Sequence, residues 1–230
     1  MKYLVSREAG LRLKSRLKEL SKYRSDGKVI IVLRRHDQWI ASHYRRYLKN
    51  GGSYSFDKFL DLDTLHPSIF GRSHLSFMNM IHLAEYYFDS PPLVLFQEEL
   101  THNLEHFLAR LTTFTGTVCD PNQINPNRLH RSYDAHQLKV VRRVGATIFN
   151  PMPTYHPNPA LHRLQRRSNL IICHIILALA RLVPKSQIST SPLIPPEHLE
   201  RVHEETADDW AACIAFARAH NPTPHHPILV

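Results

Sequence analysis

Two short apolar runs constrain the fold of this chain more than any other feature of its sequence. KVIIVL at residues 28–33 and PPLVLF at residues 91–96 are almost continuously aliphatic, and such runs are typical of strands that a parallel sheet buries on both faces. KYLV at residues 2–5 predicts a further strand. An amphipathic segment follows each run, and this alternation predicts an α/β fold with a parallel sheet flanked by helices.

Helical periodicity of apolar residues covers much of the remaining chain. The helix after the strand at 28–33 is predicted to begin with Asp37 as its N-cap. A stripe on that helix is predicted to face the core: Ile40, Tyr44, Tyr47 and Leu48. Residues 53–73 are then predicted to form a long surface loop with one short turn at 55–60.

The sequence predicts a single domain, 1–230, composed of two parts. Residues 1–118 make the α/β part, and residues 119–230 make a mainly helical C-terminal part that packs onto it. Helices are expected in the second part at 134–148, at about 160–183 and at 197–220, separated by loops rich in proline and histidine.

The charge balance favours anionic partners. The chain carries 29 Lys and Arg residues against 20 Asp and Glu, a net charge of +9. No helix-turn-helix, zinc-finger or RNA-recognition signature accompanies this charge, so no specific nucleic-acid partner is expected. With no secretory signal and three cysteines that form no CxxC pair, a cytoplasmic location is expected. His102 and His106 stand four residues apart without a third ligand, and no metal is expected.

The longest apolar stretch is LIICHIILALARLV at residues 170–183. His174 and Arg181 interrupt it, and it is shorter than the ~20 apolar residues that a membrane span needs. A buried helix, with no membrane span, is the interpretation that we favour. The basic run LHRLQRR that precedes it leaves peripheral contact with an anionic membrane as the alternative.

The end of the strand at 28–33 carries the candidate binding residues. Arg34 follows this strand directly, at the sheet edge where open α/β proteins bind their ligands. Ser42 lies eight residues later in the next helix, and Arg45 and Arg46 follow on its face. A guanidinium, a hydroxyl and the N–H groups of a helix start suit a phosphate dianion. Arg34 and Ser42 are therefore the candidate phosphate ligands, and Arg45 and Arg46 are expected to form a solvated basic face.

These residues resemble the family of PAPS-dependent sulfotransferases, and in particular its bacterial, carbohydrate-type branch. In that family a buried strand ends in Arg and a Ser follows eight positions later, and the two residues hold the 3′-phosphate of the nucleotide. Arg34 and Ser42 match this pattern, and PPLVLFQEEL is similar to the family's later strand and acidic turn. The resemblance covers about residues 1–118. It implies a P-loop-like sulfotransferase fold, PAPS as co-substrate with PAP as its product, and a hydroxyl-bearing acceptor such as a glycan.

One feature of the family is missing from the sequence. The family binds the 5′-phosphosulfate with a Gly-rich loop after its first strand, and the seven glycines of this chain form no such loop. The resemblance thus implies an N-terminally incomplete fold, whose unpaired sheet edge is expected to favour self-association. Two alternatives stay open: a sulfotransferase that modifies a carbohydrate, or a catalytically inactive domain that binds PAP or serves as a scaffold.

A sulfotransferase would also need a base for the acceptor hydroxyl. Glu8 lies just past the strand expected at 2–5 and resembles an acidic residue that some family members place there. It is the catalytic candidate, and its other interpretation is a first-turn Glu that favours the helix dipole. Glu98 and Glu99, after the strand at 91–96, are expected to cap and orient the next turn.

Overall fold

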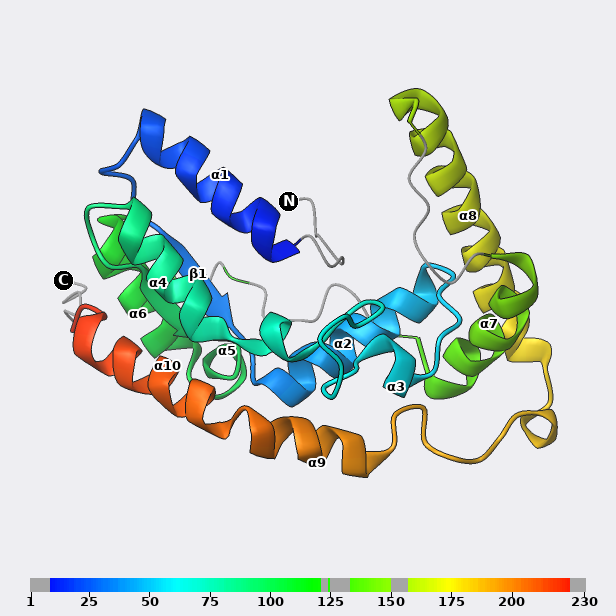
Figure 1. Cartoon of the computed structure of the whole chain (residues 1–230). Helices are drawn as coiled ribbons and strands as arrows, with labels where there is room; N and C mark the ends of the chain where they lie inside the picture. The colour runs from blue at the N-terminus through cyan, green and yellow to red at the C-terminus, as the bar shows by residue number, and fades with distance from the viewer. Residues whose placement is uncertain (1–8, 121–123, 125–132, 150–156, 224–230) are drawn as a thin grey trace. The chain divides into compact units, whose positions relative to one another are not determined.

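The computed structural model of the chain describes residues 9–120, 124, 133–149 and 157–223 (Figure 1). The chain divides into two compact units, and each unit draws on separate stretches of the sequence. In the described residues, unit 1 comprises 37–71, 133–149 and 157–202, and unit 2 comprises 9–36, 72–120, 124 and 203–223. That both units belong to one domain stays a prediction.

Unit 2 is built on a parallel pair of strands. β1 (Ile30–Leu33) pairs with β2 (Leu93–Phe96), with Ile30 opposite Leu93 and Leu33 opposite Phe96. β2 packs against three helices, α5, α6 and α10, and α1 packs against α4. The helices of this unit are α1 (Ala9–Tyr23), η1 (Arg72–Leu75), α4 (Phe77–Tyr87), α5 (Glu99–His102), α6 (Leu104–Thr115) and α10 (Ala207–His220). The strands predicted at 28–33 and 91–96 are confirmed, in a chain that is mostly helical.

The sequence predicts that the strand at 28–33 is buried on both faces, and this prediction is wrong for β1. Ile31 and Leu33 are buried, but Ile30 is 40% exposed and Val32 is 52% exposed. All four residues of β2 are buried. Within the described part of the chain the sheet has two strands, and the helices that pack on it chiefly contact β2. The expected strand at 2–5 lies outside the described residues.

Unit 1 is helical. It contains α2 (His36–Lys49), α3 (Phe56–Phe59), α7 (Ala135–Ile148), α8 (Pro159–Leu179), η3 (Ala180–Leu182), η4 (Lys185–Gln187) and α9 (Pro196–Glu205), with the first residue of α2 and the end of α9 assigned to unit 2. The apolar stripe predicted on α2 is buried as expected. Asp37 is not the N-cap, because the helix already begins at His36 and Asp37 lies inside its first turn.

Residues 53–73 do not form the expected surface loop. Their apolar side chains fill the core of unit 1: Phe56, Phe59, Leu60, Leu62, Ile69 and Phe70 are all buried. The Phe59 ring lies 5.1 Å from the ring of Tyr44 and 5.1 Å from that of Tyr47. It lies 5.2 Å from the Phe70 ring, which completes an aromatic cluster around α3.

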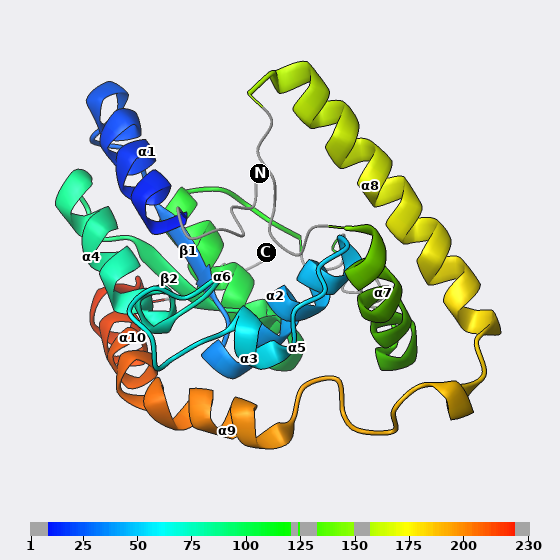
Figure 2. The same ribbon diagram turned by 45° about the vertical axis from the view of Figure 1, so that its right-hand side comes forward.

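The C-terminal helices follow the predicted pattern with one break. The predictions at 134–148 and 160–183 are confirmed by α7 and by α8 with η3, and α7 and α8 lie side by side (Figure 2). The helix predicted at 197–220 is divided at Thr206, whose φ of −112° and ψ of 7° are not helical. None of the helices in the described ranges is long and apolar enough to cross a membrane.

Candidate ligand site at the ends of the parallel strands

The two candidate phosphate ligands lie around the junction of β1 and α2. Arg34 follows Leu33, the last residue of β1, and its side chain is half-buried in unit 2. Ser42 is exposed on α2 and belongs to unit 1. The predicted strand-to-helix junction is confirmed, and the joint hold of Arg34 and Ser42 on one phosphate stays a prediction. Glu8, the catalytic candidate, lies outside the described residues.

The two arginines that follow Ser42 differ from each other. Arg46 is exposed, as expected for a solvated basic face. Arg45 is half-buried, and its Nη1 donates a hydrogen bond to the carbonyl oxygen of Tyr133, 3.2 Å away. The basic face predicted for this pair is therefore wrong for Arg45, because its guanidinium satisfies a backbone carbonyl of the chain.

Glu98 joins the carboxyl ends of the two strands. Its Oε1 accepts a hydrogen bond of 2.9 Å from the backbone N–H of Arg35, two residues after the end of β1. The N–H of Gln97 donates to the carbonyl of Leu33 over 2.7 Å and so continues the strand pairing. Glu98 occupies the N-cap position of α5 but makes no side-chain cap hydrogen bond. The predicted capping role of Glu98 is wrong, because its carboxylate is engaged with the end of the neighbouring strand.

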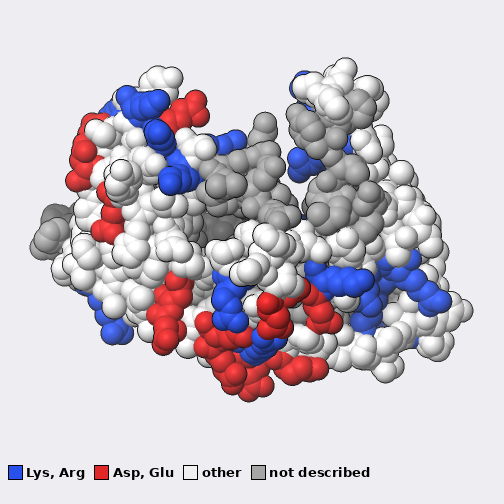
Figure 3. Space-filling view, in the orientation of Figure 1, with Lys and Arg blue, Asp and Glu red and all other residues white. Residues whose placement is uncertain are grey.

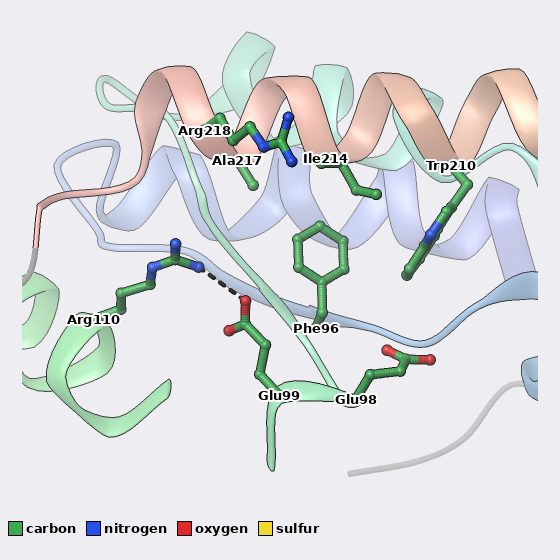
Figure 4. Close-up of a pocket in the computed structure, with 8 residues that line it drawn as sticks. All are labelled: Phe96, Glu98, Glu99, Arg110, Trp210, Ile214, Ala217 and Arg218. Carbon is green, nitrogen blue, oxygen red and sulfur yellow. Dashed lines mark hydrogen bonds and ion pairs between the residues drawn. The ribbon is translucent and has the colours of Figure 1, made fainter. Parts of the chain in front are cut away.

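A pocket of about 310 Å³ opens beside the end of β2 (Figure 4). Its volume falls in the range of small-molecule sites, roughly 300–1,000 Å³. Apolar and charged side chains line it together: Phe96, Glu98, Glu99, Arg110, Trp210, Ile214, Ala217 and Arg218. The rings of Phe96 and Trp210 meet edge to face with their centroids 5.0 Å apart. Glu99 accepts a 3.1 Å hydrogen bond from Nη1 of Arg110.

Three buried polar atoms of this lining have unused hydrogen-bonding capacity. They are Oε2 of Glu98, Oε2 of Glu99 and Nε of Arg110, and within the described part of the chain none of them has a hydrogen-bond partner. Leaving a buried polar atom unsatisfied costs about 1–3 kcal/mol, and a ligand that hydrogen-bonds to these atoms would recover that cost. The pocket is therefore the candidate ligand site of unit 2.

A buried polar network holds the start of α2 next to this site. His36, the first residue of α2, has no exposed surface, and its Nε2 lies 3.1 Å from Oδ2 of Asp209 on α10. Asp209 also accepts hydrogen bonds from the backbone N–H groups of Phe77, at 2.9 Å, and Met78, at 3.2 Å, so it satisfies the first turn of α4. The ring of His36 stacks on Phe77 with the centroids 3.9 Å apart. One carboxylate thus connects α10, α4 and the residues that follow β1.

Cysteine reactivity provides a test of this packing. Burial raises the pKa of Cys173 to about 11, and burial together with the adjacent Asp209 carboxylate raises the pKa of Cys213 to about 12. Cys119 is exposed. Only the thiolate reacts, and each unit by which the pKa is raised lowers the thiolate fraction tenfold. At pH 8 we therefore expect Cys119 to react fast, and Cys173 and Cys213 to react at least ~100-fold more slowly.

A chromogenic disulfide reagent measures the three rates, and Cys119→Ser is expected to remove the fast phase alone. The slow phases should accelerate as the pH is raised towards 11, because deprotonation of the buried thiols requires a pH near their raised pKa. Three fast thiols in the folded protein at pH 8 would contradict the packing around Cys173 and Cys213.

Sequence reasoning did not identify most residues of this site. Arg110, Trp210 and Arg218 line the pocket, and Asp209 anchors His36, yet no local motif marks any of them. Asp209 lies 173 positions from His36 in the sequence, and such a pairing has no periodicity that a sequence pattern could reveal.

The histidine pair considered as a metal site is divided between two helices. His102 ends α5 and His106 lies in α6, because Asn103 between them has a φ of −153° and a ψ of 68°. Within the ranges that the structure describes, no group of three or more His, Cys, Asp or Glu side chains is placed to hold a metal ion.

Comparison with known proteins leaves the family open. No family model matches the chain, and neither a curated protein nor a solved structure matches it.

Proposed function

We propose that the chain is a sulfotransferase-like protein that binds PAPS or PAP through Arg34 and Ser42 and transfers the sulfuryl group to a carbohydrate hydroxyl. The parallel pairing of β1 with β2 is the observation that supports this proposal most strongly. It brings Arg34 and the pocket beside Phe96 to the same edge of the sheet. Open α/β sheets bind their ligands at this edge, beyond the carboxyl ends of the strands.

The two proposed phosphate ligands contribute different chemistry. Arg34 would donate charge-assisted hydrogen bonds from its planar guanidinium, whereas Ser42 would add a neutral hydroxyl donor. The network of His36 and Asp209 supports the phosphate site, because it fixes the chain directly after Arg34 in unit 2. Because this segment is already fixed, it loses less conformational entropy when the ligand binds.

The pocket supports a hydroxyl-bearing acceptor. Glu98 and Glu99 offer carboxylate oxygens that accept hydrogen bonds from hydroxyls, and Phe96 and Trp210 offer apolar ring surface. In the proposed transfer, a bond forms between the acceptor oxygen and sulfur while the bond from sulfur to the phosphate oxygen breaks. The acceptor's proton passes to a carboxylate base, for which Glu8 remains the candidate, and PAP leaves with the electron pair of the broken bond.

The alternative is a domain that binds PAP without catalysing transfer. It is favoured by the lack of a Gly-rich strand-to-helix loop among the 230 residues, because the N–H donors of such a loop would stabilise the departing phosphate. Both alternatives share the nucleotide site. Binding therefore tests the site, and turnover separates the enzyme from the binding domain.

Arg34→Ala is expected to weaken PAP binding by about 10- to 150-fold, the loss expected for a hydrogen bond to a charged group. Calorimetric titration of the purified chain measures this loss. Arg16→Ala removes the same charge from an exposed position of α1 and is expected to leave the affinity unchanged. Adenosine 5′-phosphate, which lacks the 3′-phosphate, should bind more weakly than PAP. Equal affinities for the two nucleotides would overturn the assignment of Arg34.

Transfer of radiolabelled sulfate from PAPS to a panel of glycans then tests catalysis. Glu98→Gln is expected to reduce transfer without changing PAP affinity, because Glu98 is proposed to contact the acceptor. Glu105→Gln, on an exposed position of α6, is the matched control. PAP binding without measurable transfer to any glycan would favour the inactive binding domain.

A further inference from the structure

Helix α8 exposes a long apolar stripe. This helix and η3, which continues it, present seven large aliphatic side chains to solvent: Leu161 (48% exposed), Leu164 (62%), Ile171 (54%), Ile172 (37%), Ile175 (54%), Leu179 (56%) and Leu182 (79%). Contiguous apolar surface of this kind marks an interaction site rather than the ordinary exposure of single residues. The sequence predicts a buried helix here, and that prediction is wrong for this face.

The stripe lies opposite the face that packs within unit 1. Cys173 and Leu177 are buried, and α8 packs against α7. Ile175 stands two residues from each of them, which turns it about 200° around the helix axis, to the far side. Both ribbon views show that the N-terminal part of α8 extends beyond α7 (Figures 1 and 2). The helix therefore has two apolar faces, and the fold of unit 1 uses one of them.

The charge around the stripe has one sign. Between Asp134 and Glu197 the sequence contains eight Lys and Arg residues and no Asp or Glu. Arg163, Arg166 and Arg167 are exposed on α8 itself. Arg167 follows Leu164 by three residues and precedes Ile171 by four, so it stands beside the stripe on the helix surface. In the space-filling view, the region of α8 shows basic and uncharged residues without acidic ones (Figure 3).

We propose that α8 lies in the plane of an anionic lipid bilayer, with its aliphatic stripe in the acyl boundary and with Arg163 and Arg167, along one edge of the stripe, at the lipid phosphates. An exposed apolar face flanked by basic residues is the pattern of interfacial helices, and anionic lipids attract each basic side chain near the surface. The 21 residues of α8 extend over about 31 Å. The helix would lie on the membrane rather than cross it, because its other face is packed on α7.

Charge favours a lipid surface over a second copy of the chain. Two copies paired through the stripe would face each other with basic side chains alone, because Arg163 and Arg167 stand along its edge and no acidic side chain lies between Asp134 and Glu197 to compensate them. Like charges in contact oppose association. A lipid surface supplies the opposite charge, and its fluid acyl region accepts the stripe without needing a complementary shape.

Cosedimentation of the full chain with large unilamellar vesicles tests the proposal. Vesicles of phosphatidylcholine with 30% phosphatidylserine are expected to bind the protein at least about tenfold more strongly than vesicles of phosphatidylcholine alone, and binding should fall as salt is added. The double variant Ile171→Ser/Ile175→Ser is expected to lower binding to anionic vesicles at least about tenfold, because it removes apolar area from the stripe. Its melting temperature should match that of the parent chain, because both side chains are exposed.

Two control variants separate the stripe from general properties of the chain. Leu65→Ser changes an aliphatic residue that is 93% exposed elsewhere in unit 1 and is expected to leave binding unchanged. Arg163→Gln/Arg167→Gln should weaken binding, whereas Lys14→Gln/Lys18→Gln removes the same charge from exposed positions of α1 and should not.

Three results would overturn the proposal. The first is an equal loss of vesicle binding in Arg163→Gln/Arg167→Gln and in Lys14→Gln/Lys18→Gln, because the attraction to the lipid would then reflect the net charge of the chain alone. The second is parent-like vesicle binding by the Ile171→Ser/Ile175→Ser variant. The third is no vesicle binding by the parent chain; if light scattering then showed a dimer that this variant dissociates, the stripe would be an interface between copies.

Discussion

Phe59→Ala is expected to lower the free energy of unfolding by about 3–5 kcal/mol, the usual cost of truncating a buried phenylalanine. The Phe59 side chain has no exposed surface and lies within the aromatic cluster of unit 1. Truncation leaves a cavity that its large, closely packed neighbours cannot fill by small shifts. Urea unfolding followed by circular dichroism measures the loss.

Leu65→Ala is the matched control, because it truncates an aliphatic residue in the same segment, 53–73, that is 93% exposed. Its expected effect is within about 0.5 kcal/mol. If both variants unfolded at the same urea concentration as the parent chain, residues 53–73 would be a surface loop after all, and the core of unit 1 would not include Phe59.

Asp209→Ala is expected to destabilise the chain by about 2–4 kcal/mol, since it removes a helix cap and a buried hydrogen bond together. The change would leave the N–H groups of Phe77 and Met78 without their carboxylate acceptor at the first turn of α4. It would also remove the partner of Nε2 of His36, which lies on a fully buried ring. Thermal and urea unfolding monitored by circular dichroism measure the effect.

Asp208→Ala removes the same charge from the preceding, exposed position of α10 and should change stability by no more than about 0.5 kcal/mol. Asp209→Asn keeps an acceptor oxygen for the N–H groups of α4, so its cost should lie between those of the two alanine variants. Equal stability of Asp209→Ala and Asp208→Ala would show that the carboxylate of Asp209 does not hold α4 and His36 together.

Local patterns in the sequence determined the elements of this protein and several of their buried faces. The aliphatic runs at 28–33 and 91–96 identified β1 and β2, and the spacing from Ile40 to Leu48 identified the buried stripe of α2. These predictions succeeded because a strand or helix imposes its own period on the residues that it buries. The position of Arg34 directly after β1 followed for the same reason.

Tertiary structure alone decided which segments share a core and which side chains share a site. Residues 53–73 have no regular period, so their burial depends on contacts with α2 that the local sequence does not encode. The pocket joins Phe96 and Arg110 to Trp210 and Arg218 from a helix about one hundred residues later in the chain. The exposure of the second apolar face of α8 also follows from packing, because the sequence shows that the helix is apolar and only the fold shows which side α7 covers.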